Sequence, residues 1–204
     1  VFHRPLGFFF NIWGDGDQII LGNLAFAGVD TVTYSTSSRG VSINLALSTA
    51  SGGDAQGDSL GGIENIDGSN YSDALVGSDG ANKIIGNAGA DTIYGGSGDD
   101  TLGGRLGNDI MRGGPGADLI SGNEGIDTLD YSDSTAKVIV RLWNQTVGGV
   151  GSTAEGDRIA GMENVYGGLA GDAIVGSDPV GNKLFGFGGN DTIYGLSGND
   201  TIDG

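Results

Sequence analysis

The chain has 204 residues, of which 43 are glycine and 37% are apolar, and its formal net charge is −17 at pH 7. It has no cysteine and a single histidine, which excludes disulfides, thiolate zinc sites and a histidine-rich catalytic zinc site. The charge disfavours nucleic acid and anionic membranes as partners, and no apolar run approaches the ~18 residues of a membrane span. The glycine content favours a turn-rich all-β fold.

Residues 1–67 are interpreted as an N-terminal segment and linking strands. His3 lies in an aromatic stretch, so packing or disorder is favoured over a site. The segment GDGDQIILG resembles a degenerate repeat with Gln18 in the acidic position, and no full site is expected there. The opening lacks a signal peptide and Gly204 starts an unfinished repeat, so we expect a piece of a longer protein.

The first linking segment ends in an alternating stretch and an acidic loop. Val41–Leu47 alternates apolar and polar residues and predicts a longer strand with one buried face. Asp54 and Asp58 are interpreted as a solvated loop face, with an extra ion as the alternative. The pair Glu64 and Asn65 is interpreted as a structural cap of the roll, with a calcium-binding role as the alternative.

Residues 68–130 divide into seven consecutive nonapeptides, each starting with glycine. Position six is acidic, except for Asn82, and position eight is aliphatic or Met throughout. A fixed short period of this kind is typical of a solenoid.

Residues 131–166 form a second linking segment, and 167–204 form a second, truncated run of four repeats, one of which has ten residues and Asn182 at the acidic position. GVDTVTYS at 28–35 recurs as GIDTLDYS at 125–132, which indicates a tandem duplication. Lys137–Leu142 predicts a second longer strand. Glu155 and Asp157 repeat the acidic loop, and Glu163 repeats the cap.

Two repeats should make one coil of 18 residues, because six turn residues and three strand residues send the chain out and back. Each coil would stack about 4.8 Å on the next, with position eight pointing inward. One inward side chain per repeat gives roughly 1.5–3 kcal/mol against about 1–2 kcal/mol of ordering cost per residue. The expected fold is a right-handed parallel β-roll in two tandem units, and its thin core needs additional stabilisation.

The turns offer that stabilisation. Glycines at positions one, two and four are expected to take positive φ and point carbonyls into the turn, where position six adds a carboxylate. Stacking of repeat n on n+2 then gives an all-oxygen cage that suits Ca²⁺ better than Mg²⁺, with about seven ions. Asn82 and Asn182 predict weaker sites. The predicted calcium ligands are Asp73, Gly86, Gly89, Asp91, Gly95, Gly98, Asp100, Gly104, Gly107, Asp109, Gly113, Gly116, Asp118, Gly122, Gly125, Asp127, Asp172, Gly186, Gly189, Asp191, Gly195, Gly198 and Asp200.

GGSGDDTLG and GGPGADLIS resemble the consensus of the repeats-in-toxin (RTX), hemolysin-type calcium-binding repeats. The wider frame, GxDTxxYS followed by an alternating stretch, GIEN and nonapeptides, resembles the C-terminal roll domain of serralysin-type proteases. The resemblance implies calcium inside a parallel β-roll and export of an unfolded chain through a type I channel.

Three functions follow as hypotheses. The first is a calcium-binding module of a secreted bacterial protein that is disordered at low calcium and folds outside the cell. The second is the C-terminal roll of a secreted protease, lipase or polysaccharide epimerase; HExxH is absent, so catalysis would lie outside these residues. The third is a surface-layer or adhesin module, with polysaccharide or other copies of itself as partners.

Overall fold

The computed structural model describes residues 9–11, 19–21 and 28–204, and side chains from residue 28 onward. The described part forms 22 strands and two short 3-10 helices, η1 (Gly53–Ala55) and η2 (Leu142–Asn144). His3 and Gln18 lie outside it. No helix in this part is long and apolar enough to cross a membrane.

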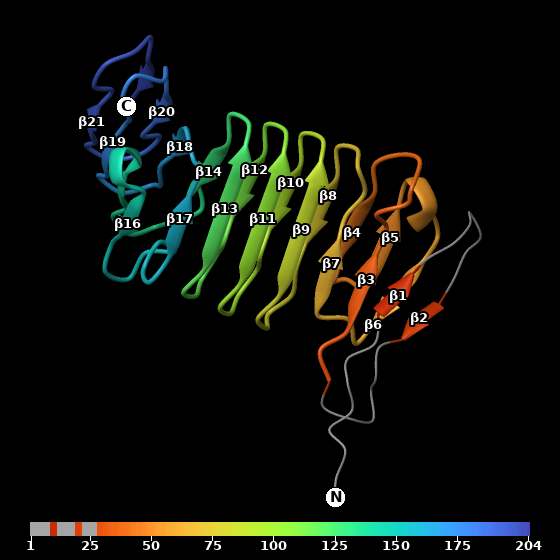
Figure 1. Cartoon of the computed structure of the whole chain (residues 1–204). Coiled ribbons are helices and arrows are strands. Elements are labelled where there is room, and N and C mark those ends of the chain that lie inside the picture. The colour runs from red at the N-terminus through yellow and green to blue at the C-terminus, as the bar shows by residue number, and fades with distance from the viewer. Residues whose placement is uncertain (1–8, 12–18, 22–27) are drawn as a thin grey trace, which may run out of the picture.

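The strands form three sheets (Figure 1). The first contains, in spatial order, β1 (Phe9–Asn11), β3 (Thr31–Thr33), β7 (Asn65–Asp67), β9 (Lys83–Ala88), β11 (Thr101–Leu106), β13 (Leu119–Glu124) and β17 (Arg158–Ala160). The second contains β2 (Ile19–Leu21), β6 (Ser59–Gly61), β5 (Thr49–Ser51), β4 (Ser42–Asn44), β8 (Ala74–Val76), β10 (Thr92–Tyr94), β12 (Ile110–Arg112), β14 (Thr128–Asp130), β18 (Asn164–Tyr166), β20 (Lys183–Phe185) and β22 (Thr201–Asp203). The third contains β16 (Thr146–Gly148), β15 (Ile139–Arg141), β19 (Ala173–Val175) and β21 (Thr192–Tyr194).

The parallel β-roll is confirmed, with the predicted coil of two repeats. In the second sheet Ile93 of β10 pairs with Leu75 and with Met111, each 18 residues away. In the first sheet Leu102 of β11 pairs in the same way with Ile84 and Ile120. Successive repeats therefore contribute strands to the two sheets alternately, and every second repeat stacks. The ten-residue repeat keeps this register, because Val165 pairs with Leu184, 19 residues on.

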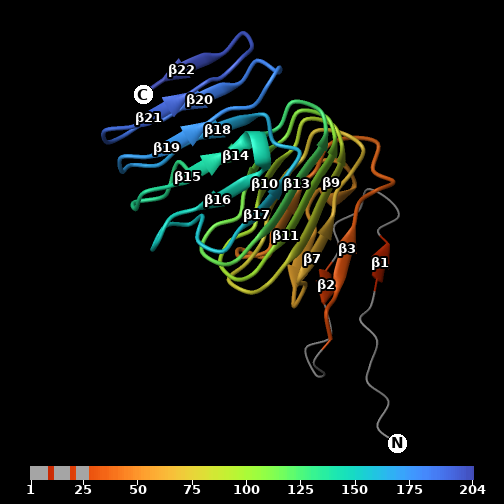
Figure 2. The same ribbon diagram turned by 60° about the vertical axis from the view of Figure 1, so that its left-hand side comes forward.

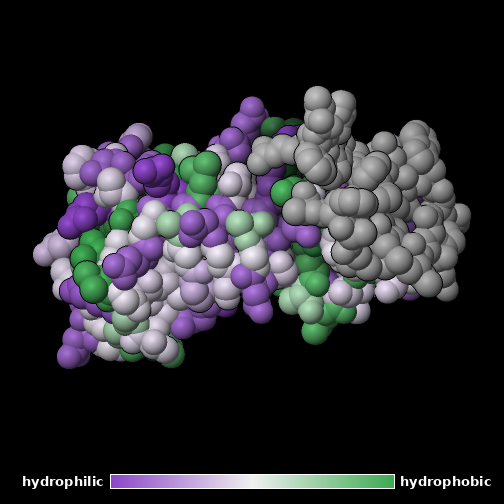
Figure 3. Space-filling model, turned by 90° about the horizontal axis from the view of Figure 1, so that it is seen from below, coloured by the Kyte–Doolittle hydropathy of each residue, from purple (hydrophilic) through white to green (hydrophobic). Residues whose placement is uncertain are grey.

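The core consists of the position-eight side chains, as predicted. All of them from Leu75 to Leu184 are buried, and they join the apolar residues of the linking segments in one cluster. Ile202 is 49% exposed because β22 is the last strand of its sheet. The surface seen in Figure 3 is mixed, with small hydrophobic areas among hydrophilic residues.

The linking segments correct one prediction. Val41, Ile43 and Leu45 are buried, as the alternation indicates, but no longer strand forms. The chain turns after Asn44, and β4 pairs antiparallel with β5 as a short hairpin. The second segment repeats this with β15 and β16. Each reversal contains a residue with positive φ, Ser48 at 55° and Gln145 at 53°, which ends the extended stretch.

The two linking segments lie in different sheets. Strands β4, β5 and β6 are inserted between β2 and β8 of the second sheet, whereas β17 pairs with β13 in the first. β15 and β16 begin the third sheet, which carries the C-terminal strands β19 and β21 (Figure 2). Successive repeats alternate between the two sheets, and an odd number of repeats, seven, separates the two linking segments. The second linking segment therefore enters on the opposite side of the roll from the first.

Truncating the core at Ile120 tests this packing. Ile120→Ala should lower the free energy of unfolding by about 2–5 kcal/mol, because a fully buried side chain leaves a cavity. Ile202→Ala removes the same atoms from the exposed end and should cost less than about 1 kcal/mol. Denaturant unfolding at fixed calcium measures both, and equal losses would contradict the stacked core.

Candidate metal sites

The position-six aspartates connect successive coils through a repeated hydrogen bond. The backbone N–H of Asp91 donates to Oδ1 of Asp109, 2.8 Å away, and the N–H of Asp109 donates in the same way to Asp127. On the other side of the roll the N–H of Asp100 donates to Asp118 at 2.8 Å. One carboxylate oxygen of each aspartate is therefore fixed by the preceding coil.

The second oxygen of these carboxylates has no donor. Among the described residues, buried Oδ2 atoms without a hydrogen-bond partner occur at Asp91, Asp100, Asp109, Asp118, Asp127 and Asp191. The first five side chains belong to residues that are at most 2% exposed. A buried charged oxygen without a partner is costly, so each of these turns needs a positive group.

The position-one glycines show where that group would lie. A methyl group on Gly95 would collide with Oδ2 of Asp100 and would lie 2.7 Å from the carbonyl oxygen of Gly113, in the next coil. A methyl group on Gly86 would meet Asp91 and the carbonyl of Gly104 in the same way. The carboxylate and the carbonyl of the next turn thus converge on one small space beside the glycine Cα.

The glycine prediction is only partly right. The position-four glycines have the expected positive φ, from +100° to +154°: Gly89, Gly98, Gly107, Gly116, Gly125, Gly189 and Gly198. The position-one glycines do not have positive φ: Gly86, Gly95, Gly104, Gly113, Gly122, Gly186 and Gly195. At position one glycine is required because any Cβ would occupy the space beside the carboxylate.

Burial makes these carboxylates hard to ionise in the metal-free chain. Desolvation, together with neighbouring acids, raises the pKa of Asp91 and of Asp100 to about 7. The same desolvation raises the pKa of Asp109 and of Asp118 to about 6. A bound cation would remove this penalty by pairing with the ionised form.

The donor set fits calcium. No three Asp, Glu, His or Cys side chains of the described residues converge on one point, so backbone carbonyls must supply much of any coordination. A carboxylate with several carbonyls on flexible turns is the hard, all-oxygen environment that Ca²⁺ accepts. The residues that would hold it are the aspartates with a free Oδ2 and the turns stacked on them.

Four of the predicted turns differ from the rest. Both oxygens of Asp73 already accept backbone N–H groups, from Val41 at 2.7 Å and from Ser69 at 2.7 Å. Asp172 is satisfied in the same way. The amide of Asn82 donates to the carbonyl of Glu64 at 2.6 Å, and Asn182 does the same with Glu163. The polar atoms of these four side chains are therefore already hydrogen-bonded within the protein, and none of them needs a cation.

Two of the linking-segment interpretations are wrong. Asp58 and Asp157 are not on a solvated face: both are buried and accept the hydroxyl hydrogen bonds of Tyr34 and Tyr131, at 2.9 and 2.8 Å. The Asp118 N–H donates to Oδ1 of Asp157, so Asp157 continues the series of position-six acids. Asp157 lies 39 residues after Asp118, whereas the other aspartates of the series are 18 residues apart, so the nonapeptide spacing does not reveal it.

The capping role of Glu64 and Glu163 agrees with the structure. Oε2 of Glu163 accepts the N–H of Asp127 at 2.8 Å, where the next position-six acid would stand. Glu64 accepts the N–H of Asp30 in the first unit. Glu163 therefore ends the series of coil-to-coil bonds that runs through Asp91, Asp109 and Asp127, and Glu64 accepts one such bond in the first linking segment.

Comparison with known protein families gives one match. The family described as RTX calcium-binding nonapeptide repeat (4 copies) matches residues 67–102, 103–131 and 182–204. The matched segments include every aspartate that has a free Oδ2. No curated protein matches the chain.

The raised pKa values predict different pH dependences with and without calcium. In the metal-free chain the folded state holds protons that the unfolded state loses, so its folded fraction should fall as pH rises from about 4 to about 7. With saturating calcium the carboxylates stay ionised in the folded state, so stability should change little between pH 5 and pH 8. Circular dichroism of the metal-free chain and thermal unfolding of the calcium-loaded chain, each at pH 5 and pH 8, measure the two dependences.

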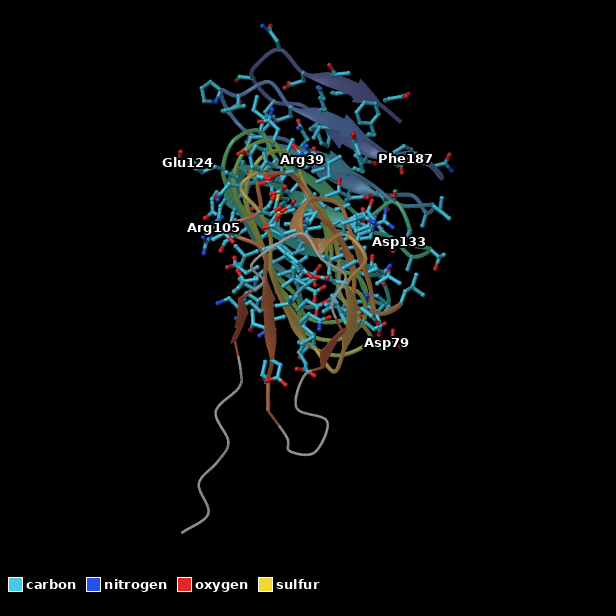
Figure 4. All side chains as sticks on the ribbon, turned by 90° about the vertical axis from the view of Figure 1, so that its right-hand side faces the viewer. Arg39, Asp79, Arg105, Glu124, Asp133 and Phe187 are labelled. Atoms are coloured by element: carbon cyan, nitrogen blue, oxygen red, sulfur yellow. The ribbon has the colours of Figure 1, made fainter. Side chains whose placement is uncertain are left out.

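A matched pair of variants separates this effect from overall charge. Asp100→Asn should reduce the pH dependence of the metal-free chain, whereas Asp79→Asn, at an exposed turn residue labelled in Figure 4, should leave it unchanged. Equal effects of the two substitutions would show that general charge repulsion, not these buried carboxylates, sets the pH dependence.

Proposed function

Because the chain carries RTX calcium-binding nonapeptide repeats, and so is a calcium-binding β-roll module, we propose that it completes its folding only when calcium fills the turns. The observation that supports this most directly is the set of buried Oδ2 atoms without donors. A module stable without ions would pair these oxygens with its own N–H or O–H groups, as it does at Asp73 and Asp157.

The free energy available from calcium is large enough for such a role. An ion that binds only the folded state adds about 1.4 kcal/mol at tenfold saturation. Several sites of this kind contribute an amount comparable to the whole stability of a domain, about 5–15 kcal/mol. Within its runs of repeats the roll buries one position-eight side chain per nonapeptide, and the chain has a net charge of −17, which favours an expanded state without calcium.

We infer that the parent protein is secreted, since RTX repeats are typical of secreted proteins. Extracellular calcium sites bind with Kd values of about 10⁻⁴–10⁻³ M, so they would stay empty in the cytoplasm and fill outside the cell. An unfolded chain inside the cell suits export through a type I channel. Calcium would then trigger folding after export.

The proposed module binds and folds; it does not catalyse. Its buried carboxylates recur in equivalent surroundings along the roll, which favours ligands over one tuned acid–base pair. The parent protein could join this roll to a secreted enzyme, as the serralysin-like frame suggests, or use it as a surface-layer or adhesin module. The full-length reading frame distinguishes these.

Calcium removal tests the folding role. At pH 8, chelation of the wild-type chain should abolish the strand signal in circular dichroism and increase the hydrodynamic radius, and added calcium should restore both. Asp109→Asn should raise the calcium concentration at the midpoint of folding about three- to tenfold, because one charged ligand is lost.

The control is Asp79→Asn, which removes the same charge from an exposed turn position. Its folding midpoint should stay within about twofold of wild type. If chelation leaves the circular dichroism spectrum and the hydrodynamic radius unchanged, the folding role is refuted. Calcium binding is a separate question, which equilibrium dialysis answers.

A further inference from the structure

The eleven repeat turns fall into two classes, according to what their position-two residue does. In the first two turns of each run, the position-two N–H donates to the side chain at position six of its own turn. The bonds run from Ser69 to Asp73 (2.7 Å), from Ser78 to Asn82 (2.6 Å), from Gly168 to Asp172 (2.5 Å) and from Ser177 to Asn182 (2.7 Å). We call these the closed turns.

The other seven turns have a left-handed residue at position two. Their φ angles lie between +65° and +113°, at Asn87, Gly96, Arg105, Gly114, Asn123, Phe187 and Leu196. Six of these turns contain the aspartates whose Oδ2 has no donor. The seventh contains Asp200, and its position-two residue, Leu196, has the same left-handed φ. We call these the open turns.

The backbone angle explains the difference. A left-handed position-two residue rotates its peptide, so its N–H no longer points at its own position-six side chain and the carboxylate oxygen is left free. In the closed turns this oxygen accepts a backbone N–H, so these turns do not require a cation. The conformation at position two thus determines whether a turn has a negative oxygen to offer.

The open conformation carries a cost that needs compensation. Left-handed φ costs roughly 1–2 kcal/mol for a residue with a side chain, and Arg105, Phe187 and Leu196 are unusual residues to adopt it. Phe187 is 54% exposed (Figure 4), so the ring contacts that it makes with Tyr166 and Phe185 bury only part of its side chain. Backbone strain of this kind persists where another interaction depends on it.

We propose that only the open turns hold calcium, and that the first two turns of each run are metal-free starting turns. This assignment rests on the proposed calcium-binding function and refines it. The sites lie between each open turn and the coil that follows, so the first run holds about five ions, beside Asp91, Asp100, Asp109, Asp118 and Asp127. Asp73 and Asp172 are then structural, contrary to their prediction as ligands.

The linking segment completes the last two sites of the first run. A methyl group on Gly122 would meet both Oδ2 of Asp127 and the carbonyl of Gly161, which belongs to the linking segment. Asp157 occupies the corresponding place after Asp118, through its bond to the Asp118 N–H. Pairing of the seven repeats alone would place the first site at the first turn of the run. In this assignment the first site lies one coil later, and the last two sites include the linking segment.

Two equivalent substitutions in adjacent coils test the assignment. Asp73→Asn should bind as many calcium ions per chain as wild type, because its turn holds no ion. Its stability should be lower, since the new NH2 group faces one of the two N–H groups that Asp73 accepts, those of Val41 and Ser69. Asp91→Asn, one coil further along the same side, should bind about one ion fewer. Equilibrium dialysis with ⁴⁵Ca at saturating calcium counts the ions, and circular dichroism confirms the folded state.

Each outcome decides the matter. Loss of an ion from Asp73→Asn, or no loss from Asp91→Asn, would overturn the assignment while leaving calcium binding intact. A wild-type chain that binds no calcium would instead refute the proposed function. If Asp91→Asn fails to fold at saturating calcium, the count for Asp109→Asn, another open turn, replaces it, with the same single-ion loss expected.

Discussion

The roll depends on one repeated interaction, the hydrogen bond from the position-six N–H of one coil to the carboxylate of the coil stacked on it. It fixes the register of the turns as the parallel strands fix the register of the core. It also buries the carboxylate, because Oδ1 can reach the neighbouring coil only from inside the turn. The need for a cation is therefore a consequence of how the coils stack, and a thin hydrophobic core makes that need decisive.

Much of the roll could be predicted from the sequence, because a fixed nine-residue period indicates a solenoid in which every second repeat stacks. The alternation of strands between two sheets, the inward ladder from Leu75 to Leu184 and the carboxylates in the turns were all predictable from spacing, but the reason for glycine at position one was not. The hairpins β4–β5 and β15–β16 were not, since alternating hydrophobicity gives the buried face but not where a strand ends. The role of Asp157 was hidden too, because it is brought into the series by chain folding and not by period.

The closed turns escaped prediction for a different reason. Asp73 and Asp91 occupy the same position of the repeat, and their residue type does not distinguish them. The difference lies in the φ angle of Ser69 and of Asn87, and both serine and asparagine are common in turns. Only the coordinates reveal that one carboxylate is already satisfied by N–H groups while the other is not.

The second oxygen of the buried carboxylate thus has three different surroundings along the chain. At Asp73 it accepts a backbone N–H, at Asp157 it accepts a tyrosine hydroxyl, and at Asp91 it has no donor within the protein. The first two partners are covalently part of the protein and act at any calcium concentration. They stand at the beginning of a run and in the linking segment, which are also the parts with buried apolar residues outside position eight, such as Val41 and Tyr131. Dependence on calcium is consequently concentrated after the second turn of each run. In the first run it lies between the closed turns and the linking segment that holds Asp157, and these fix where the first and last ion-binding coils lie.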